Sequence, residues 1–399
     1  MSQAQVEPHG HVDRHVFVRQ HNESRILAAI AGSTEPVSRV WIAEVTGLSK
    51  PTVNTLVDEL LASGLLREAG IRTGSIGRPA SLVQVNPDAG MVLALAFDGD
   101  GLGAVVADIT GAQRGEAHVP LPASERLVAT AAALVDDVLR QCGITADAVH
   151  AVSVSAPGIL EPGSDRRALA QNVPGLDDGA LQRMLSERFD AQIAFENDVN
   201  LAAIGEHRYG IAVGAHDFVF LLVDTGVGMG LMLNGELLRG SRGAAGEAGF
   251  LPIGPEPLVG KVVRIGALES QAGISGLLGR YRSERAARKL PASRPSLATF
   301  LRALDEHEPA ALATAQREIE LIAHAVLAVC VLVDPQFVVL AGRIGSLPYI
   351  LEGVRKELAR VAPYPIEVQV SALHPSAAIM GAVARGTQLA RLRLGLPDR

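Results

Sequence analysis

Cysteine is scarce in this sequence. The 399 residues include two cysteines, Cys142 and Cys330, which stand far apart and each in an apolar context. Two isolated thiols cannot build a disulfide framework or supply the ligands of a cysteine-based tetrahedral zinc site. We therefore expect buried thiols in a protein of the reducing cytoplasm, with no bound metal.

Long apolar runs are also missing. No stretch approaches the roughly 20 consecutive apolar residues that a membrane-spanning helix requires. Residues 1–19 are polar and rich in histidine, without the apolar segment of a signal peptide. We expect residues 1–20 to form a disordered tail and the protein to have no membrane partner.

Aromatic residues make up 4% of the chain, whereas hydrophobic residues make up 48% and charged residues 20%. The cores must therefore consist mainly of Ala, Val, Leu and Ile, in an ordinary globular balance. A length of 399 residues is sufficient for two or three domains.

The strongest local pattern lies near the start, where helical patterns occupy residues 24–31, 39–45 and 50–63. Between the second and third, Gly47 supplies a flexible corner and Ser49 an N-cap hydroxyl. Proline follows in the first helical turn, where a missing N–H costs nothing. This order predicts a helix-turn-helix.

The third helical pattern has two distinct faces. Apolar residues at helical spacing predict one buried face: Val53, Leu56, Val57, Leu60 and Leu61. The opposite face carries side chains able to touch phosphates and base edges: Lys50, Thr52, Asn54, Thr55 and Asp58. We expect this face to read double-stranded DNA.

Two short strands are predicted at residues 65–66 and 83–85, joined by a glycine-rich segment with three arginines, among them Arg78. Such a hairpin has the shape of a wing that lies along DNA beside a recognition helix. The alternative is a small helical domain with a loop. Helix, turn, helix and wing in this order favour a winged helix-turn-helix over residues 21–87.

A protein that holds DNA mainly through charge is usually basic. The net charge of −7 therefore indicates that charge alone does not hold DNA here. The positive surface must be local, and affinity would depend on two heads in one homodimer or tetramer. We expect Thr52, Asn54 and Thr55 to read bases. The remaining expected DNA-binding residues hold phosphates or reach a groove edge: Ser38, Arg39, Ser49, Lys50 and Arg78.

After residue 87 the chain alternates between strands and helices. Strands are predicted at residues 91–97, 102–108, 113–120 and 149–155, with a helix at 125–141 between the last two. A second round has strands at 218–223, 228–233 and 337–341. These two βββαβα-like units resemble the actin–hexokinase (ribonuclease H-like) ATPase fold, in which a cleft between two lobes holds a nucleotide and a sugar.

Asn197 and Asp198 lie where a predicted strand at residues 192–195 meets a predicted helix at 201–208. An amide and a carboxylate at a strand end can hydrogen-bond adjacent hydroxyls in a cleft. In a kinase, the aspartate would accept the hydroxyl proton during phosphoryl transfer. The alternative is that the pair caps the helix.

Further residues point to a pocket. A glycine-rich turn at residues 224–230 suits close approach of a phosphate to backbone N–H groups. Glu247 and Glu269 stand beside glycines and apolar residues, which favours a pocket over a solvated surface.

Together these motifs resemble the ROK family of repressors, open reading frames and kinases, from about residue 20 to the C-terminus. The DNA-binding half of the resemblance lies in residues 38–39, 46–50, 52–53 and 77–79. The cleft half lies in residues 196–200, 226–228, 235–237, 245–247 and 268–269. The nucleotide-side and C-terminal motifs correspond to residues 333–335, 342–344 and 381–382.

The resemblance implies an α/β body behind the winged helix. Its first lobe would comprise residues 88–199, completed by a C-terminal helix at 376–399, and its second lobe residues 200–375. It also implies that Asn197, Asp198, Glu247 and Glu269 contact the hydroxyls of a sugar or sugar derivative.

The phosphate loop departs from the family pattern. Family kinases open the fold with Asp-x-Gly-x-Thr, but here Ala96 replaces the metal-organising aspartate and Asp100 replaces the threonine. A carboxylate about 4 Å from a phosphate charge costs about 4 kcal/mol at an effective dielectric of ~20. We expect no ATP binding and no phosphoryl transfer, so the protein would not be an enzyme.

The zinc motif departs as well. Relatives commonly hold zinc with a His in Glu-x-Gly-His and a cysteine-rich loop. Here Phe250 stands at the histidine position, and residues 258–267 contain no cysteine. We expect a zinc-free protein in which Phe250 and apolar neighbours stabilise the loop.

The preferred hypothesis is a ROK-type transcriptional regulator, a repressor that binds a near-palindromic operator and whose cleft binds a sugar-like effector. A second hypothesis is a sugar kinase with an added DNA-binding head. A third is a regulator whose vestigial cleft binds nothing.

Overall fold

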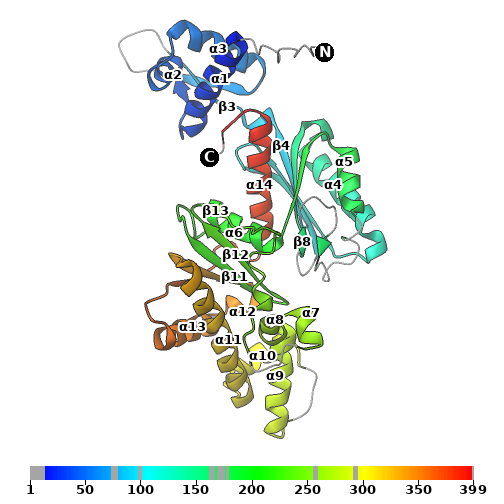
Figure 1. The fold of residues 1–399 in the computed structure, drawn as a ribbon. Helices are drawn as coiled ribbons and strands as arrows, with labels where there is room; N and C mark the ends of the chain where they lie inside the picture. The colour runs from blue at the N-terminus through cyan, green and yellow to red at the C-terminus, as the bar shows by residue number, and fades with distance from the viewer. Residues whose placement is uncertain are drawn as a thin grey trace, which may run out of the picture.

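A computed structural model describes residues 14–72, 80–97, 101–160, 167–168, 176, 179–254, 259–290 and 295–397. An N-terminal head, a first lobe and a second lobe follow one another along an elongated molecule (Figure 1). The C-terminus lies at the junction of the head and the first lobe. The chain therefore returns to the head after completing the second lobe.

The head is a winged helix-turn-helix, which confirms the prediction. Its helices are α1 (Arg14–Gly32), α2 (Arg39–Thr46) and α3 (Lys50–Ala62). Its sheet has the order β1-β3-β2, with strands β1 (Val37–Ser38), β2 (Leu66–Arg72) and β3 (Ala80–Val85). Strand β1 was not predicted from the sequence.

The expected disordered tail is wrong for residues 14–20, because helix α1 begins at Arg14. From Phe17 onward, where burial is described, the first half of this helix has no buried apolar side chain that would mark it in the sequence. Phe17 is 63% exposed, whereas Ile26 and Leu27 in the second half are buried. Residues 1–13 lie outside the described part of the chain.

The two lobes share one sheet plan. In each sheet the first three strands run antiparallel and the fourth and fifth add in parallel, in the spatial order 3-2-1-4-5. The first sheet consists of β4 (Met91–Phe97), β5 (Gly101–Asp108), β6 (Gln113–Pro120), β7 (Val149–Ser155) and β10 (Gln192–Glu196). The second consists of β11 (Phe218–Val223), β12 (Val227–Leu233), β13 (Glu236–Leu237), β14 (Phe337–Ala341) and β15 (Val368–Val370). The repeated plan confirms the expected actin/hexokinase-like fold.

Helices cover both sheets. The first lobe carries α4 (Leu127–Cys142), α5 (Ala180–Arg188) and α14 (Ala377–Arg393), beside a short hairpin of β8 (Ile159–Leu160) and β9 (Arg167–Ala168). The second lobe carries α7 (Lys261–Ile265), α8 (Ala267–Ala272), α9 (Ile274–Ala287), α10 (Leu297–Asp305), α11 (Pro309–Val333), α12 (Gly342–Gly345) and α13 (Pro348–Val361). Of the helices described, none combines the length and apolar character needed to cross a bilayer.

Helix α6 (Asp198–Tyr209) joins the lobes. It packs on β12 of the second sheet and crosses α14, which itself lies on β4, β5 and β7. The crossing is close at Gly205 and Gly381: a Cβ atom at Gly381 would lie 1.7 Å from the carbonyl oxygen of Leu201. Only glycine permits this approach, so α6 and α14 form one tightly packed pair.

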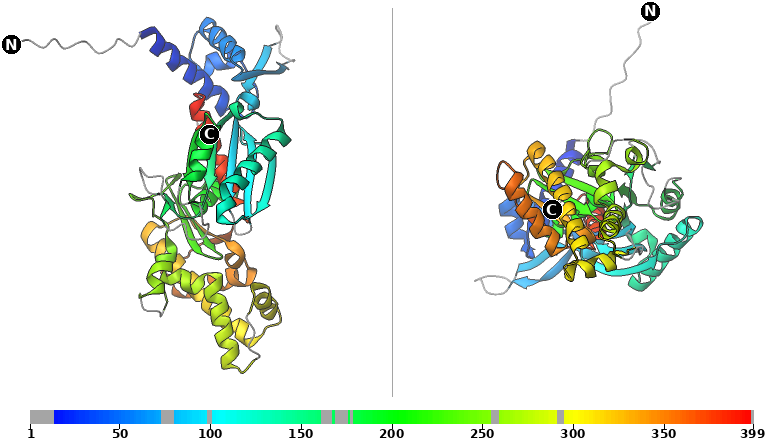
Figure 2. Two further views of the ribbon diagram at one scale, coloured as in Figure 1. Left: turned by 90° about the vertical axis from the view of Figure 1, so that its right-hand side faces the viewer. Right: turned by 90° about the horizontal axis from the view of Figure 1, so that it is seen from below.

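The head rests directly on the first lobe (Figure 2). One apolar cluster runs through both, because head residues such as Leu60 and Val83 share it with Val92, Ile109 and Leu389. Burying apolar surface from both parts stabilises their contact. The head is therefore packed on the first lobe and is not a separate unit on a loose linker.

Candidate functional site

Helix α3 presents a polar face to solvent. Lys50, Asn54 and Thr55 are exposed, while Val53 and Val57 on the opposite face are fully buried. The predicted division of the helix into a buried and a polar face is correct. Apart from Leu61, which is half-buried, the apolar positions face the core.

Three of the expected DNA-contacting hydroxyl groups take part in local hydrogen bonds. Ser38 Oγ accepts from the N–H of Trp41 at 3.2 Å and caps α2. Ser49 Oγ accepts from the N–H of Thr52 at 3.3 Å and lies 2.8 Å from Thr52 Oγ1, which caps α3. These bonds fix the start of both helices.

Arg39 is held within the head. Its guanidinium donates to Asp58 at 2.6 Å and to the carbonyl of Asn54 at 3.3 Å. The hydrogen bond from Arg39 lowers the pKa of Asp58. To bind a phosphate, Arg39 would have to exchange the carboxylate on α3 for it. Arg78, also expected to contact DNA, lies outside the described residues.

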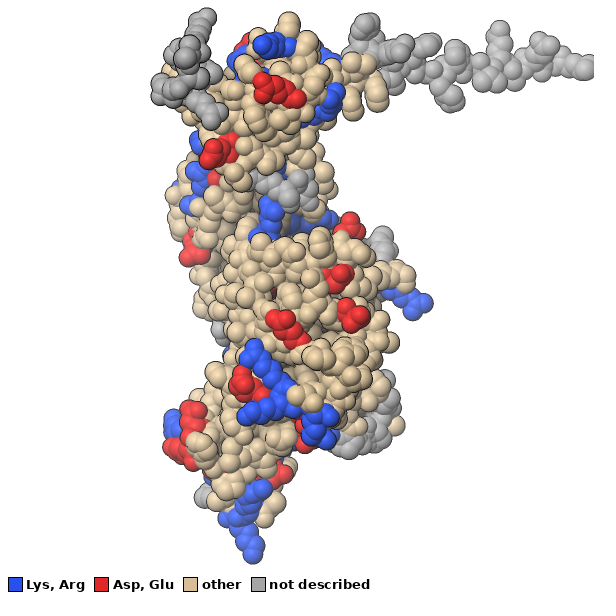
Figure 3. Space-filling view, turned by 90° about the vertical axis from the view of Figure 1, so that its left-hand side faces the viewer, with Lys and Arg blue, Asp and Glu red and all other residues tan. Residues whose placement is uncertain are grey.

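Charges on the head are mixed. The space-filling view shows Lys and Arg side chains interspersed with Asp and Glu on the visible face of the head (Figure 3). The expected local positive surface does not stand out on this face, where Arg39 is paired with Asp58.

A cavity of about 600 Å³ opens between the lobes. The ends of β7 and β10 and the start of α6 contribute to its wall from one side, and the β11–β12 turn and α8 from the other. The structure brings together all four residues expected to bind an effector: Asn197, Asp198, Glu247 and Glu269.

Asn197 is largely committed to capping α6. Its Oδ1 accepts from the N–H groups of Val199 and Asn200 at 2.9 and 3.2 Å, and its Nδ2 donates to the carbonyl of Gly158 at 3.4 Å. The helix-cap alternative therefore describes this side chain. The amide orients the first turn of α6, in which Asp198 lines the cavity.

The cavity concentrates negative charge. Burial raises the pKa of Glu247, and the nearby carboxylates of Asp198 and Glu269 raise it further. Burial also raises the pKa of Glu269, although the N–H of Val227 donates to its Oε2 at 3.1 Å and opposes this shift. Arg264 is the one cationic side chain among the described residues of the wall.

The glycine-rich turn at 224–230 faces the carboxylate of Glu269. A Cβ atom at Gly226 would lie 3.0 Å from Oε2 of Glu269, which shows how closely the side chain fills the turn. The N–H of Val227, which could have met a phosphate, already has a carboxylate partner. The turn thus differs from the phosphate-binding turn that the sequence indicated.

Burial raises the pKa of Asp224, at the start of this turn, but hydrogen bonds from Arg343 outweigh that effect and hold the pKa below its ordinary range. Arg343 donates from its backbone N–H at 2.8 Å and from Nε at 2.9 and 3.1 Å. The two segments lie 119 residues apart in the sequence, and no local pattern indicates their pairing.

Phe250 corrects another expectation. It is 40% exposed and lines the cavity, so it does not pack into the loop as an apolar stabiliser. Ala96 is buried at the end of β4, and Asp100 lies outside the described residues. In the described part of the chain, no group of three or more His, Cys, Asp or Glu side chains is arranged to hold a metal.

Two protein-family models match this chain. A model of the ROK family matches residues 93–389, and a model of the MarR family matches residues 20–72. A xylose repressor from Caldicellulosiruptor bescii is 28% identical over 272 residues, which cover 66% of each chain. The chain thus spans just under two thirds of this relative's length.

Solved structures share the fold. A ROK family transcriptional regulator, described as a homologue of the E. coli MLC protein, superposes with a TM-score of 0.74 at 18% identity, over 95% of this chain and 99% of that one. A ROK hexokinase from Thermus thermophilus superposes with a TM-score of 0.61 at 27% identity, over 73% of this chain and 96% of that one. Because the ROK model spans most of the sequence, the chain belongs to the ROK family.

Proposed function

We propose that this chain is a cytoplasmic transcriptional regulator, a repressor that binds operator DNA through its head and a sugar-like effector in its interlobe cavity. The observation that carries the proposal is a winged helix-turn-helix packed directly on a ROK body. The polar face of α3 is exposed there, as major-groove reading requires. The relative named xylose repressor supports the same function.

Two heads in a homodimer or tetramer would bind the two halves of a near-palindromic operator. Recognition helices of such dimers lie about one helical turn of DNA apart. Within each head, Thr52, Asn54 and Thr55 would contact bases. Lys50 and Arg78 would contact phosphates, while Arg39 would hold α3 through Asp58.

The cavity favours a ligand rich in hydroxyl groups. Ionised carboxylates accept hydrogen bonds and cannot donate them, so Asp198, Glu247 and Glu269 would bind sugar hydroxyls or a protonated amine. The same carboxylates would disfavour a phosphorylated sugar or a sugar acid. Phe250 adds an apolar surface on which a sugar ring could rest.

Three features oppose phosphoryl transfer. Ala96 offers no carboxylate to organise a metal ion. Glu269 already accepts from the N–H of Val227 in the glycine-rich turn, and its charge would repel a phosphate. Arg343 ties Asp224 to α12. We therefore propose no ATP-dependent activity. We also propose no zinc ion, because Phe250 stands at the expected histidine position and residues 258–267 contain no cysteine.

A sugar kinase with a DNA-binding head is the second candidate, supported by Asp198 in the cavity and by the likeness to a hexokinase. Two assays separate the candidates. The regulator should enrich a specific duplex from a random library, and a hexose or amino sugar should raise its melting temperature. Sugar-dependent consumption of Mg-ATP would instead establish the kinase.

The same thermal-shift screen tests the third hypothesis, a regulator whose cavity binds no effector. A regulator with an empty cavity would still select a duplex, but no sugar would raise its melting temperature. Asp198→Ala would then leave release from the duplex unchanged.

A further inference from the structure

Helix α6 touches two functional regions with its two ends. Asp198 in its first turn lines the cavity, and Tyr209 is its last residue. Twelve helical residues span about 18 Å. Helix α6 therefore reaches from the cavity wall toward the part of the first lobe that lies nearest the head.

The Tyr209 end meets the turn between β5 and β6. Gly111 in this turn has φ +87°, and a Cβ atom there would lie 2.5 Å from the Tyr209 hydroxyl oxygen. The hydroxyl thus rests against the turn with no side chain between them. Burial raises the pKa of Tyr209, as expected for a hydroxyl enclosed by the first lobe.

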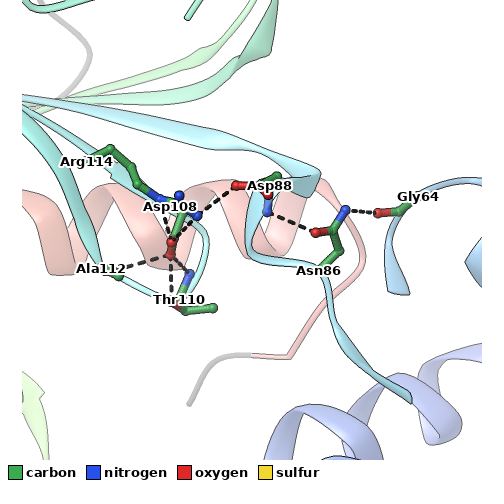
Figure 4. Close-up of polar contacts among 7 residues, drawn as sticks. All are labelled: Gly64, Asn86, Asp88, Asp108, Thr110, Ala112 and Arg114. Carbon is green, nitrogen blue, oxygen red and sulfur yellow. Dashed lines mark hydrogen bonds and ion pairs between the residues drawn. The ribbon is translucent and has the colours of Figure 1, made fainter. Parts of the chain in front are cut away.

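The turn is a rigid unit built on Asp108. This carboxylate is 2% exposed, and its Oδ1 accepts from the N–H and hydroxyl of Thr110 at 2.8 and 2.6 Å and from the N–H of Ala112 at 3.3 Å. Its Oδ2 accepts from Nε of Arg114 at 3.0 Å. Figure 4 shows these bonds converging on one side chain.

Arg114 continues from the turn toward the head (Figure 4). Nη2 of Arg114 donates to Oδ1 of Asp88 at 2.7 Å, and the backbone N–H of Asp88 donates to Asn86 Oδ1 at 3.2 Å. Asn86 Nδ2 then donates to the carbonyl of Gly64 at 2.8 Å. Gly64 lies two residues beyond the end of α3, so the hydrogen bonds reach the segment that directly follows the recognition helix.

Helix α14 holds the same turn from behind. Arg391 is 1% exposed, and it donates to the carbonyl of Ile109 at 3.4 Å and to that of Pro397 at 2.9 Å. Ile109 itself belongs to the apolar cluster that the head shares with the first lobe. The turn is thus in contact with α6, α14 and the linker to the head.

We infer that the β5–β6 turn transmits the state of the cavity to the head, with Tyr209 and Arg114 as positioning residues for DNA recognition. This inference rests on the proposed function. A ligand that binds one arrangement of the lobes more tightly shifts the population toward it. When α6 moves, Tyr209 displaces the turn, and Arg114 carries the displacement to Asp88, Asn86 and α3.

The decisive variant needs no effector. Gly111→Ala places a methyl group against the Tyr209 hydroxyl and should raise the Kd for the selected duplex about 3- to 30-fold, the range of mutations along coupling networks. Adding Tyr209→Phe removes the clashing oxygen and should restore most of the affinity. Gly143→Ala is the matched control: its φ is +65° and a Cβ there meets nothing within 4 Å.

A second variant separates positioning from direct DNA contact. Arg114→Met should weaken binding to the selected duplex more than to random duplexes and should leave the salt dependence unchanged. A residue that touches a phosphate would instead reduce the salt slope by about one. Arg140→Met removes the exposed Arg140–Asp137 pair of the first lobe and should change neither quantity.

The outcomes are distinguishable. Equal duplex affinities for Gly111→Ala and Gly143→Ala, or no recovery in the double variant, would overturn the inference while leaving the proposed function intact. Failure of the unmodified chain to select any duplex would overturn the proposed function, and the inference with it. Preferential loss of specific binding in Gly111→Ala, with rescue by Tyr209→Phe, would establish both.

Discussion

The backbone N–H of Arg343 lies 2.8 Å from Oδ2 of Asp224, and its Nε lies 2.9 Å from Oδ1. Arg343 therefore binds the carboxylate through both its main chain and its side chain. The pair joins the glycine-rich turn after β11 to helix α12.

The Arg343–Asp224 pair should stabilise the second lobe. Arg343→Met should lower the free energy of unfolding at pH 7 by about 1–2 kcal/mol, since hydrogen bonds to charged groups contribute about 1.5–3 kcal/mol and this guanidinium is half exposed. The pKa of Asp224 is lowered in the folded state. The difference in unfolding free energy between Arg343→Met and the unmodified chain should therefore vanish as pH falls through this lowered pKa, where Asp224 becomes protonated. Urea unfolding at pH 7 and at low pH measures this effect, and a difference that persists unchanged in acid would contradict it.

Glu247 should destabilise the empty protein at neutral pH. Its folded-state pKa is raised by burial and by Asp198 and Glu269, so its favourable contribution exists below the ordinary value of 4.5 and is lost as pH rises through the raised value. Glu247→Gln should therefore raise the melting temperature at pH 8 and have little effect at pH 4.

Glu116→Gln is a suitable control for this experiment, because Glu116 is exposed on β6 and does not line the cavity. The melting temperatures of both variants, measured between pH 4 and pH 8, test whether Glu247 destabilises the empty protein. Equal shifts for the two variants at pH 8 would show that the carboxylates of the cavity do not repel one another.

Asn54 should contribute to sequence preference rather than to general affinity. A good bidentate base contact contributes about 1–3 kcal/mol of discrimination, so Asn54→Ala should lower the preference for the selected duplex about 5- to 150-fold. Binding to random duplexes should change little. Gel-shift titrations with both duplexes measure the ratio, and Gln316→Ala, an exposed amide on α11, serves as the control. Equal losses on both duplexes would show that Asn54 does not read bases.

Asp58→Asn tests the internal role of Arg39. Asparagine keeps an acceptor oxygen but removes the negative charge, so the 2.6 Å ion pair that holds Arg39 on α3 is lost and Arg39 becomes more available to DNA phosphates. Random-duplex binding should strengthen slightly and its salt slope should steepen, since one more cation can displace counterions. An unchanged slope would indicate that Arg39 remains attached to α3 by its bond to the carbonyl of Asn54.

Much of the fold could be predicted because buried strands leave a direct mark in the sequence. The strands at 91–97, 149–155, 218–223 and 337–341 begin and end where the apolar pattern and the flanking turn residues indicated. Strand β1 was missed because two residues, Val37 and Ser38, are too short a segment to show a period. Helix α1 was cut short because its first half projects from the core.

The site was predictable in its residues but not in its pairings. Asn197, Asp198, Glu247 and Glu269 were selected from motifs, and they do line one cavity. No local pattern indicates that Arg343 pairs with a residue 119 positions earlier, or that Tyr209 meets Gly111. Phe250 was misplaced because the sequence does not show whether its side chain faces the loop or the cavity.

The most direct test of the central claim is the ratio of two dissociation constants, measured for the purified full-length chain on its selected duplex and on a random duplex at one physiological salt concentration. A regulator that reads DNA through α3 should bind the selected duplex at least about a thousandfold more tightly. Equal affinity for the two duplexes, together with sugar-dependent consumption of Mg-ATP, would contradict the account.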